Sequence, residues 1–398
     1  MIDLFKDVQE APADAILGIK QVFKGDPRPQ KVDLSIGVYQ DDNGDVPALE
    51  VVQEGIKRIP PTLLKGGYLP IEGLPEYLSG VQSLLFGDNA SVLQEKRVVT
   101  VQSSGGTGAL RYGADFLKRY FPNSTVYISN PTWNNHRSIF ERVGFVVDTY
   151  PYYDSEIKGL NFEVLRRKLS EINAGDIVIF HACCHNPSGV DLSTEEWREV
   201  VQIAKDRSFI PFLDFAYQGF ANGIEEDALP LREFAAAGVQ FLVANSFSKN
   251  LSLYRRRIGA LSLVCADAEQ AKRVLTQIRT DVRTNNSNPP IDGAAIVATV
   301  LNDAALKLKW EQEVSVMRDR ITNMRQKFVD ALVAKGVGER FKHLLNQRGM
   351  FSFSGLSKKE VETLRDDYAI YALLNGRICV AAMNERNIAY VAESIAKL

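Results

Sequence analysis

The chain has 398 residues, of which 45% are hydrophobic, so it is long enough for two linked domains and too apolar to be disordered. Its 47 Lys and Arg residues nearly balance its 49 Asp and Glu residues, and the formal net charge is -2. This balance gives no electrostatic reason to expect a nucleic acid or an anionic membrane as a partner.

The N-terminal segment and the cysteines bear on the cellular compartment. Residues 1–10 carry four charged side chains and lack the apolar core of a signal peptide. No apolar run approaches the roughly 20 residues that a membrane-spanning helix needs. The four cysteines lack the spacing of a disulfide framework. We therefore expect a cytoplasmic protein with reduced cysteines and no membrane partner.

Seven short runs with the composition of β-strands alternate with helical patterns in the first two thirds of the chain. The runs are 97–102, 125–129, 145–150, 176–180, 209–213, 241–244 and 258–264. Helical spacing between them, as in 107–120 and 194–207, indicates repeated strand and helix units. We expect an α/β fold with a mainly parallel seven-stranded sheet that is flanked by helices. In such sheets ligands bind at the carboxyl ends of the strands, so the loops there are where chemistry is expected.

The last third of the chain has a different pattern. Apolar residues recur in steps of four and three from Trp310 to Leu332, which predicts one long amphipathic helix. Two strand-like runs follow, at 350–353 and 378–381. The pattern predicts a smaller α+β unit at the end of the chain.

The first loop of interest, 103–109, is rich in glycine and lies between a predicted strand and a predicted helix. Glycines let the backbone approach an anion, and a helix N-terminus offers free N–H groups, so this loop is a candidate phosphate cradle. It is not a dinucleotide fingerprint, because Arg111 stands where the third glycine would be needed. It also lacks the lysine of a P-loop.

The next two loops place aromatic and polar side chains after strands. Loop 130–136 contains Trp133, which is placed to stack on a flat ring, although a structural tryptophan is the commoner role for one such loop. Loop 181–189 contains two histidines and two cysteines, but adjacent cysteines on a strand point to opposite faces and no Cys-x-x-Cys spacing occurs. We therefore expect no metal there, and we expect Asn186 to serve as a donor to a phenolate oxygen.

The last two loops supply a carboxylate and an amine. Asp214 directly follows a predicted strand, with Tyr217 three residues later, and suits a buried cation such as a pyridinium N–H. Taken alone, that loop is more typical of an aspartate that caps a loop or binds magnesium. Lys249 follows the strand at 241–244 between small polar residues, where its amine is placed to form an imine with an aldehyde. A single lysine of this kind is usually only solvated.

Taken together, these motifs resemble the class I, fold-type I aminotransferases of the aspartate and aromatic amino acid group. The resemblance extends over nearly the whole chain, through 34–39, 68–74 and 375–377. It implies pyridoxal 5'-phosphate as cofactor and a ping-pong transfer of amino groups between an aromatic or dicarboxylic amino acid and a 2-oxo acid. It also implies a homodimer with shared active sites, an N-terminal arm (1–13), a large domain (47–316) and a small domain (14–46 and 317–398).

The resemblance assigns a role to each candidate residue. Lys249 would form the Schiff base and shuttle a proton, Asp214 would keep the pyridine nitrogen protonated, and Tyr217 would bond to the phenolic oxygen. The other cofactor-binding residues would be Asn186, Trp133, Gly106, Thr107, Ser246 and Arg257. Tyr68 would also bind the cofactor, but in the site of the partner subunit. The substrate-binding residues would be Gly37, Trp133, Asn186, Arg377 for the α-carboxylate, and Arg283, supplied by the partner, for a distal carboxylate.

Some features depart from the family pattern or leave alternatives open. Gly105 stands where a serine is common, and Ser252 and Arg256 stand where glycine and an acidic residue are frequent. The resemblance also predicts cis peptide bonds at Asn130–Pro131 and Asn186–Pro187. A strict aspartate aminotransferase and another fold-type I enzyme, such as a lyase or decarboxylase, remain alternatives. A regulator built on this fold would need an added DNA-binding module.

Overall fold

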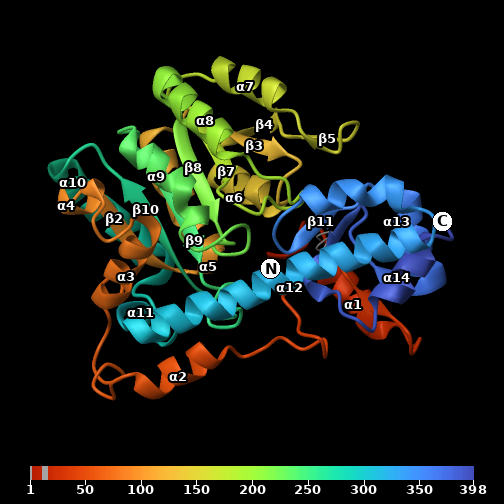
Figure 1. Ribbon diagram of the computed structural model, residues 1–398. Coiled ribbons are helices and arrows are strands. Elements are labelled where there is room, and N and C mark those ends of the chain that lie inside the picture. Colours follow the sequence, from red (N-terminus) through yellow and green to blue (C-terminus); the bar gives the residue numbers. More distant parts are fainter. Residues whose placement is uncertain (1, 11–16) are drawn as a thin grey trace.

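A seven-stranded sheet forms the centre of the computed structural model, which describes residues 2–10 and 17–398 (Figure 1). Its strands run in the spatial order β2-β10-β9-β8-β7-β3-β4, and only β10 is antiparallel to its neighbours. All seven strands predicted from the sequence are confirmed: β2 (Val98–Ser104), β3 (Thr125–Asn130), β4 (Val146–Pro151), β7 (Ile177–His181), β8 (Ile210–Phe215), β9 (Phe241–Ser246) and β10 (Ile258–Val264).

Helices cover both faces of this sheet, which explains why its strands are almost continuously apolar. Side chains alternate between the faces along each strand. In β7, Ile177 and Ile179 pack in one hydrophobic cluster, and Val178 and Phe180 pack in the other. The first cluster includes residues of α5 (Gly105–Tyr120), α6 (Asn135–Val143) and α10 (Ala268–Asn286). The second includes residues of α3 (Pro75–Phe86), α7 (Phe162–Glu171), α8 (Thr194–Arg207) and α9 (Leu229–Ala236).

Local sequence signals account for the ends of the helices. At α8 the side chains of Ser193 and Glu196 form a capping box, and the helix ends at Ser208 in the left-handed conformation. The predicted helix at 194–207 is therefore confirmed. The predicted helix at 107–120 is confirmed as α5, which begins at Gly105, directly after β2.

The predicted long helix is also confirmed, and it leads from the sheet towards the C-terminal part of the chain (Figure 1). After α11 (Asp292–Asn302), α12 extends over Ala304–Ala334, with its apolar stripe buried. Trp310 in this stripe donates its indole N–H to the carbonyl oxygen of Asn250 at 2.8 Å. The helix thus supports the turn that contains Lys249. Within the described part of the chain, no helix combines the length and hydrophobicity that a membrane span requires.

The two ends of the chain pack together beside α12. Strand β1 pairs in parallel with β12, and β11 pairs antiparallel with β13. The elements of this part are α1 (Leu17–Gly25), β1 (Val32–Asp33), η2 (Gly338–Asn346), β11 (Phe351–Phe353), α13 (Lys358–Tyr368), β12 (Ile370–Tyr371), β13 (Arg377–Cys379), η3 (Val380–Ala382) and α14 (Ile388–Ile395). The predicted strand 378–381 is thus wrong in its last two residues, which form a 3-10 turn.

The remaining elements are short and connect or flank the main layers. They are α2 (Glu50–Arg58), α4 (Ser91–Gln94), β5 (Tyr153–Asp154), β6 (Gly159–Leu160) and η1 (Glu226–Ala228). The division into an arm, a large domain and a small domain stays a prediction. Residues 1 and 11–13 of the predicted arm, and the first residues of the predicted small domain, lie outside the described residues.

Candidate active site

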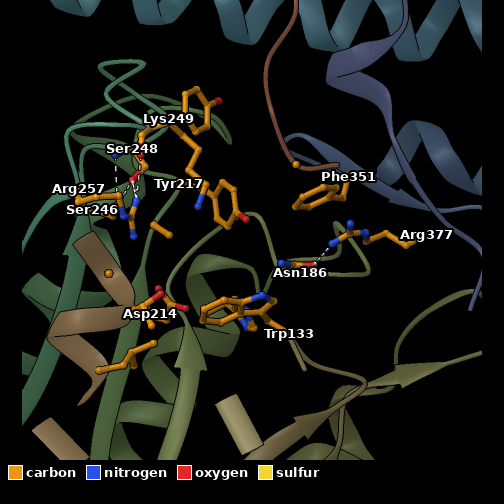
Figure 2. Close-up of a pocket in the computed structure, with 17 residues that line it drawn as sticks. Trp133, Asn186, Asp214, Tyr217, Ser246, Ser248, Lys249, Arg257, Phe351 and Arg377 are labelled. Atoms are coloured by element: carbon orange, nitrogen blue, oxygen red, sulfur yellow. Dashed lines mark hydrogen bonds between the residues drawn. The ribbon is translucent and has the colours of Figure 1, made fainter. Parts of the chain in front are cut away.

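The predicted site residues converge on one cavity of about 260 Å³ at the carboxyl ends of the sheet strands (Figure 2). Eleven of the thirteen line it: Gly37, Gly106, Thr107, Trp133, Asn186, Asp214, Tyr217, Ser246, Lys249, Arg257 and Arg377. These residues come from β-strand ends, from the start of α5 and from both ends of the chain. The cavity is therefore a place where distant segments meet.

The amine of Lys249 is buried in this cavity, in the turn that follows β9. Its Nζ lies 4.7 Å from the centroid of the Tyr217 ring. Burial lowers the pKa of Lys249 to about 8, with the positive charge of Arg257 acting in the same direction and the Asp214 carboxylate opposing it. The unprotonated, nucleophilic fraction of the amine near neutral pH is therefore much larger than for an exposed lysine, although it remains the smaller fraction.

Asp214 lies in β8 and offers one oxygen to the protein and one to the cavity. Its Oδ2 lies 2.9 Å from Nε2 of His136, whose Nδ1 lies 2.9 Å from the hydroxyl of Thr132. Burial raises the pKa of Asp214, but the His136 hydrogen bond and nearby positive charge lower it further, so that it lies below its usual value. Its Oδ1 is buried without a hydrogen-bond partner among the described residues. An ionised, buried oxygen of this kind fits a cationic N–H donor.

The opposite end of the cavity is built to hold an anion. Nη1 of Arg257 donates to the hydroxyl of Ser248 at 3.1 Å, and that hydroxyl is 3.1 Å from the Ser246 hydroxyl. Gly106 and Thr107, in the first turn of α5, line the same cavity, and the first turn of a helix has N–H groups without a partner in the helix. Of the three consecutive arginines at 255–257, only Arg257 lines the cavity. Arg257 is therefore the one of these three arginines that could contact an anion in the cavity, and its role as a phosphate ligand stays a prediction.

Gly105 allows Arg257 to come this close. Its φ is +72°, which favours glycine, and a Cβ at this position would lie 2.6 Å from Nη2 of Arg257. The glycine that replaces the family's common serine therefore leaves room for the guanidinium group. Gly106 and Thr107, which follow it, line the cavity as predicted.

A buried guanidinium group forms the third feature of the cavity. Arg377 is 2% exposed, and burial lowers its pKa. It donates to the side-chain oxygen of Asn186 at 3.1 Å and to the carbonyl oxygen of Ser35, and it lies 4.1 Å from the centre of the Phe351 ring. It forms no ion pair with a described carboxylate, and its Nε has no partner among the described residues. Such a group suits a carboxylate ligand.

Tyr68 and Arg283 do not line this cavity. The side chain of Tyr68 is 91% exposed. Arg283 is also exposed, and its Nη1 donates to Ser287 and Asn288 at 2.6 and 3.2 Å. Both were expected to act in a partner's site rather than in their own. That assignment stays a prediction.

The two predicted cis peptide bonds, at Asn130–Pro131 and Asn186–Pro187, are confirmed.

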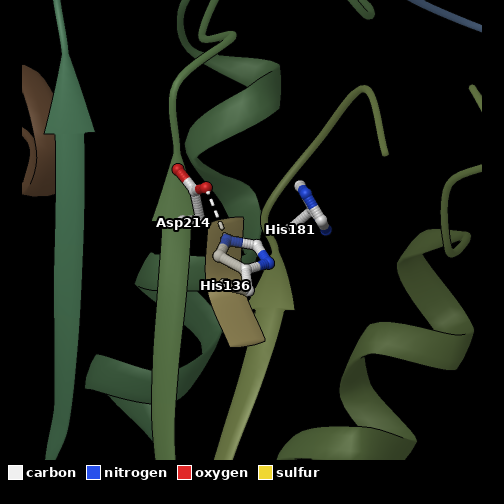
Figure 3. Close-up of side chains that lie close together, drawn as sticks. All are labelled: His136, His181 and Asp214. Carbon is white, nitrogen blue, oxygen red and sulfur yellow. Dashed lines mark hydrogen bonds and ion pairs between the residues drawn. The ribbon is translucent and has the colours of Figure 1, made fainter. Parts of the chain in front are cut away.

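His136, His181 and Asp214 are the one described group close enough to hold a metal ion (Figure 3). Both ring nitrogens of His136 already lie within hydrogen-bond distance of Thr132 and Asp214. Burial and the neighbouring histidines keep the pKa of His181 well below its usual value.

The two cysteines at 183–184 follow β7 rather than lying on it, and Cys184 has a φ of +51°. The sequence argument that these two cysteines lie on a strand, with their side chains on opposite faces, was therefore wrong.

Sequence reasoning missed several residues of the cavity. They are Leu110, His181, Ala216, Ser248, Tyr254 and Phe351. Ser248 was detectable, because it lies between Ser246 and Lys249 in the same loop. Phe351 and Tyr254 were not, because nothing in a single sequence shows which apolar or aromatic residues turn towards a site.

Comparison with known proteins identifies the family. The model of the family "Aminotransferase class I and II" matches residues 29–395. The chain belongs to the class I and II aminotransferase family. It is 48% identical to an aspartate aminotransferase of Pseudomonas aeruginosa over 397 residues, which are 100% of both chains. It is 49% identical to an aromatic-amino-acid aminotransferase of Escherichia coli, with 99% of both chains covered.

A solved structure of the same family superimposes closely. It is the crystal structure of an aromatic-amino-acid aminotransferase from Burkholderia pseudomallei covalently bound to pyridoxal phosphate. The TM-score is 0.97 and the sequences are 48% identical, with 100% of this chain and 99% of that chain covered. The predicted aminotransferase fold is therefore confirmed.

Proposed function

We propose that this aminotransferase uses pyridoxal 5'-phosphate to exchange amino groups between aromatic or dicarboxylic amino acids and 2-oxo acids. One observation carries the proposal. The buried amine of Lys249 shares a cavity with an unpaired carboxylate oxygen of Asp214 and with the unpaired guanidinium group of Arg377. These three groups suit an aldehyde, a cationic ring nitrogen and a carboxylate, respectively.

The described residues fit this cofactor. Asp214 would accept the ring N–H, Trp133 would stack on the ring, and Tyr217 and Asn186 would donate to its phenolic oxygen. Burial raises the pKa of Tyr217, so that its phenol keeps the proton it would donate. The phosphate would be held by the cluster at the other end of the cavity, Gly106, Thr107, Ser246, Ser248 and Arg257.

When bound, pyridoxal phosphate supplies an aldehyde for the amine and a conjugated ring that takes up electrons from the substrate's α-carbon. The protein's own contribution is placement and proton transfer. Arg377 and Asn186 orient the α-carboxylate, because a guanidinium group pairs with both oxygens of a carboxylate. Lys249 lies within the cavity and, as an unprotonated amine, takes the proton from the α-carbon of the amino acid. In the second half-reaction it returns a proton to the α-carbon of the former 2-oxo acid.

The same proposal includes a homodimer, in which Tyr68 and Arg283 enter the cavity of the partner subunit. Their exposure in the single chain supports this assignment. Arg283 would pair with the distal carboxylate of aspartate or 2-oxoglutarate. With an aromatic substrate it would turn towards solvent, because an unpaired guanidinium buried against a ring is destabilised. A cytoplasmic location belongs to the proposal too, and the four cysteines are free thiols.

The specificity constants kcat/KM for phenylalanine, tyrosine, tryptophan and aspartate, each with 2-oxoglutarate, test this function. We expect measurable transamination of both classes. Turnover of aspartate alone would instead identify a strict aspartate aminotransferase. Release of carbon dioxide or of a side-chain fragment as the main product would identify a decarboxylase or a lyase.

The variant Arg283→Leu tests the substrate pocket. Loss of one two-pronged charged contact should lower kcat/KM for aspartate at least about tenfold, with a much smaller effect on phenylalanine. Single-turnover kinetics should be used, so that the second half-reaction does not interfere. If both amino acids lose the same factor, Arg283 does not recognise the distal carboxylate.

A further inference from the structure

Two segments that carry Arg283 and Tyr68 are bonded to each other within one chain, outside the cavity. Arg283 lies in the last turn of α10 and donates to the side-chain oxygen of Asn288 at 3.2 Å. The side-chain nitrogen of the same Asn288 donates to the carbonyl oxygen of Leu69 at 2.8 Å. One amide group thus connects Arg283 to the residue that follows Tyr68.

A two-pronged ion pair joins the same segments further down. Nε and Nη2 of Arg279 donate to the two carboxylate oxygens of Glu72 at 2.9 and 2.5 Å. Arg279 precedes Arg283 by one helical turn, so both lie on one side of α10, and Glu72 follows Tyr68 by four residues. Burial raises the pKa of Glu72 and the bond from Arg279 lowers it, with a net decrease, so both partners are charged.

Gln102 anchors the two segments to the sheet. It is 1% exposed and lies in β2, which leads into α5 and the anion-binding end of the cavity. Its backbone N–H donates to the carbonyl oxygen of Glu72 at 2.7 Å, and its side-chain N–H donates to the carbonyl oxygen of Pro290 at 2.6 Å. The two segments are therefore fixed where they contact the buried Gln102, while Tyr68 at the other end is exposed.

We propose that Arg279 is a positioning residue, whose ion pair with Glu72 holds Tyr68 and Arg283 as one unit for delivery to the partner's cavity. This inference rests on the proposed function, which sends those two residues across the dimer. The pair is partly exposed, with side-chain exposures of 40% and 21%, so it adds little to stability. Its two-pronged geometry fixes the relative orientation of the two segments instead.

Hybrid dimers of two differently tagged chains test the proposal in the holoenzyme. The first hybrid joins a Lys249→Ala chain to an Arg279→Met chain. Its working lysine lies in the Arg279→Met chain, whose cavity receives Tyr68 and Arg283 from the chain with an intact Arg279. The second hybrid joins a chain with both substitutions to an unchanged chain, so its working cavity receives the residues of the substituted chain.

We expect the second hybrid to have a kcat/KM for aspartate about tenfold lower than the first, because small displacements of a binding group reduce rates strongly. Both hybrids contain the same two substitutions, so a general loss of stability affects them alike. Equal activities would overturn the proposal. In homodimers, the exchange Glu72→Arg with Arg279→Glu should restore most of the activity that Arg279→Met loses.

Lys272→Met is the matched control, since Lys272 lies on the same helix and, among the described residues, pairs only with the exposed Glu269. It should leave kcat/KM for aspartate and the affinity for pyridoxal phosphate unchanged, whereas Arg279→Met should weaken both. Suppose that Arg279→Met behaves like Lys272→Met, while Arg283→Leu lowers kcat/KM for aspartate much more than for phenylalanine. This inference then fails and the proposed function stands. If Arg283→Leu lowers kcat/KM for both amino acids by the same factor, the proposed function fails at that residue.

Discussion

Asp214 and Arg377 each keep one buried polar atom without a partner among the described residues, and these atoms have opposite charge. An unsatisfied buried group costs about 1–3 kcal/mol. The His136 bond to Asp214, and the bonds from Arg377 to Asn186 and Ser35, satisfy the remaining atoms and fix the orientation of each group. The unpaired atoms therefore mark where a ligand supplies the missing contacts.

Asp214→Ala should reduce turnover far more than Asn186→Ala. The first change removes the carboxylate partner of a charged ring nitrogen, whereas the second removes one hydrogen bond to the cofactor and one acceptor of Arg377, whose guanidinium group keeps its bond to Ser35. Bonds to charged groups contribute roughly 1.5–3 kcal/mol and neutral ones about 0.5–1.5 kcal/mol. The measurement is kcat at saturating cofactor for both variants. Equal losses would show that Asp214 does not hold the ring nitrogen.

The lowered pKa of Lys249 predicts how cofactor uptake depends on pH. Only the free amine reacts, so the rate at which the cofactor-free enzyme binds the aldehyde covalently should rise with pH through a midpoint near 8 and level off at higher pH. The carboxylate of Asp214 stabilises the ammonium form, so Asp214→Asn should move this midpoint to lower pH. Stopped-flow absorbance from pH 6 to 10 follows the reaction. A midpoint near 10.5, the value of an exposed lysine, would contradict the account.

At the scale of elements, the seven strands were predictable because both faces of the sheet are covered, which makes each strand a short apolar run between polar loops. The loops after those strands supplied Lys249 and Trp133 for the same reason. Asp214 was expected directly after its strand but lies within it, because β8 extends to Phe215. The long-range pairs were not predictable. Arg377 contacts Asn186 across 191 positions, and His136 contacts Asp214 across 78, and no local pattern encodes such a contact.

The helix that holds the anion-binding end packs tightly on the sheet, and Gly113 makes this possible. A Cβ at Gly113 would lie 2.5 Å from the Phe212 ring. Gly113→Ala should therefore destabilise the protein by about 1–3 kcal/mol, although alanine favours helix formation. Gly108→Ala is the control in the same helix, where the nearest atom would be 3.4 Å away. Chemical unfolding of both variants checks this, and equal stabilities would refute the packing argument.

At the scale of the whole molecule, the cavity is a junction of segments that are far apart in the sequence. Gly37 comes from the N-terminal part, Lys249 from the sheet and Arg377 from β13. A ligand that binds all of them stabilises only the assembled fold. Binding of the cofactor together with a carboxylate substrate should therefore raise the melting temperature of the entire chain in one transition. Composition and periodicity could not show the partner's contribution, and only the family resemblance assigned Tyr68 and Arg283 to it, because these exposed residues acquire a role only in the proposed dimer.

The most direct test of the account is reduction of the cofactor-loaded enzyme with borohydride, followed by peptide mapping. Of the lysines that the structure describes, Lys249 alone lines the cavity. We expect the reduced pyridoxyl group on Lys249, and we expect Lys249→Ala to abolish both the label and transamination. A stoichiometric label on any other lysine, or transamination by Lys249→Ala at the wild-type rate, would contradict the central claim.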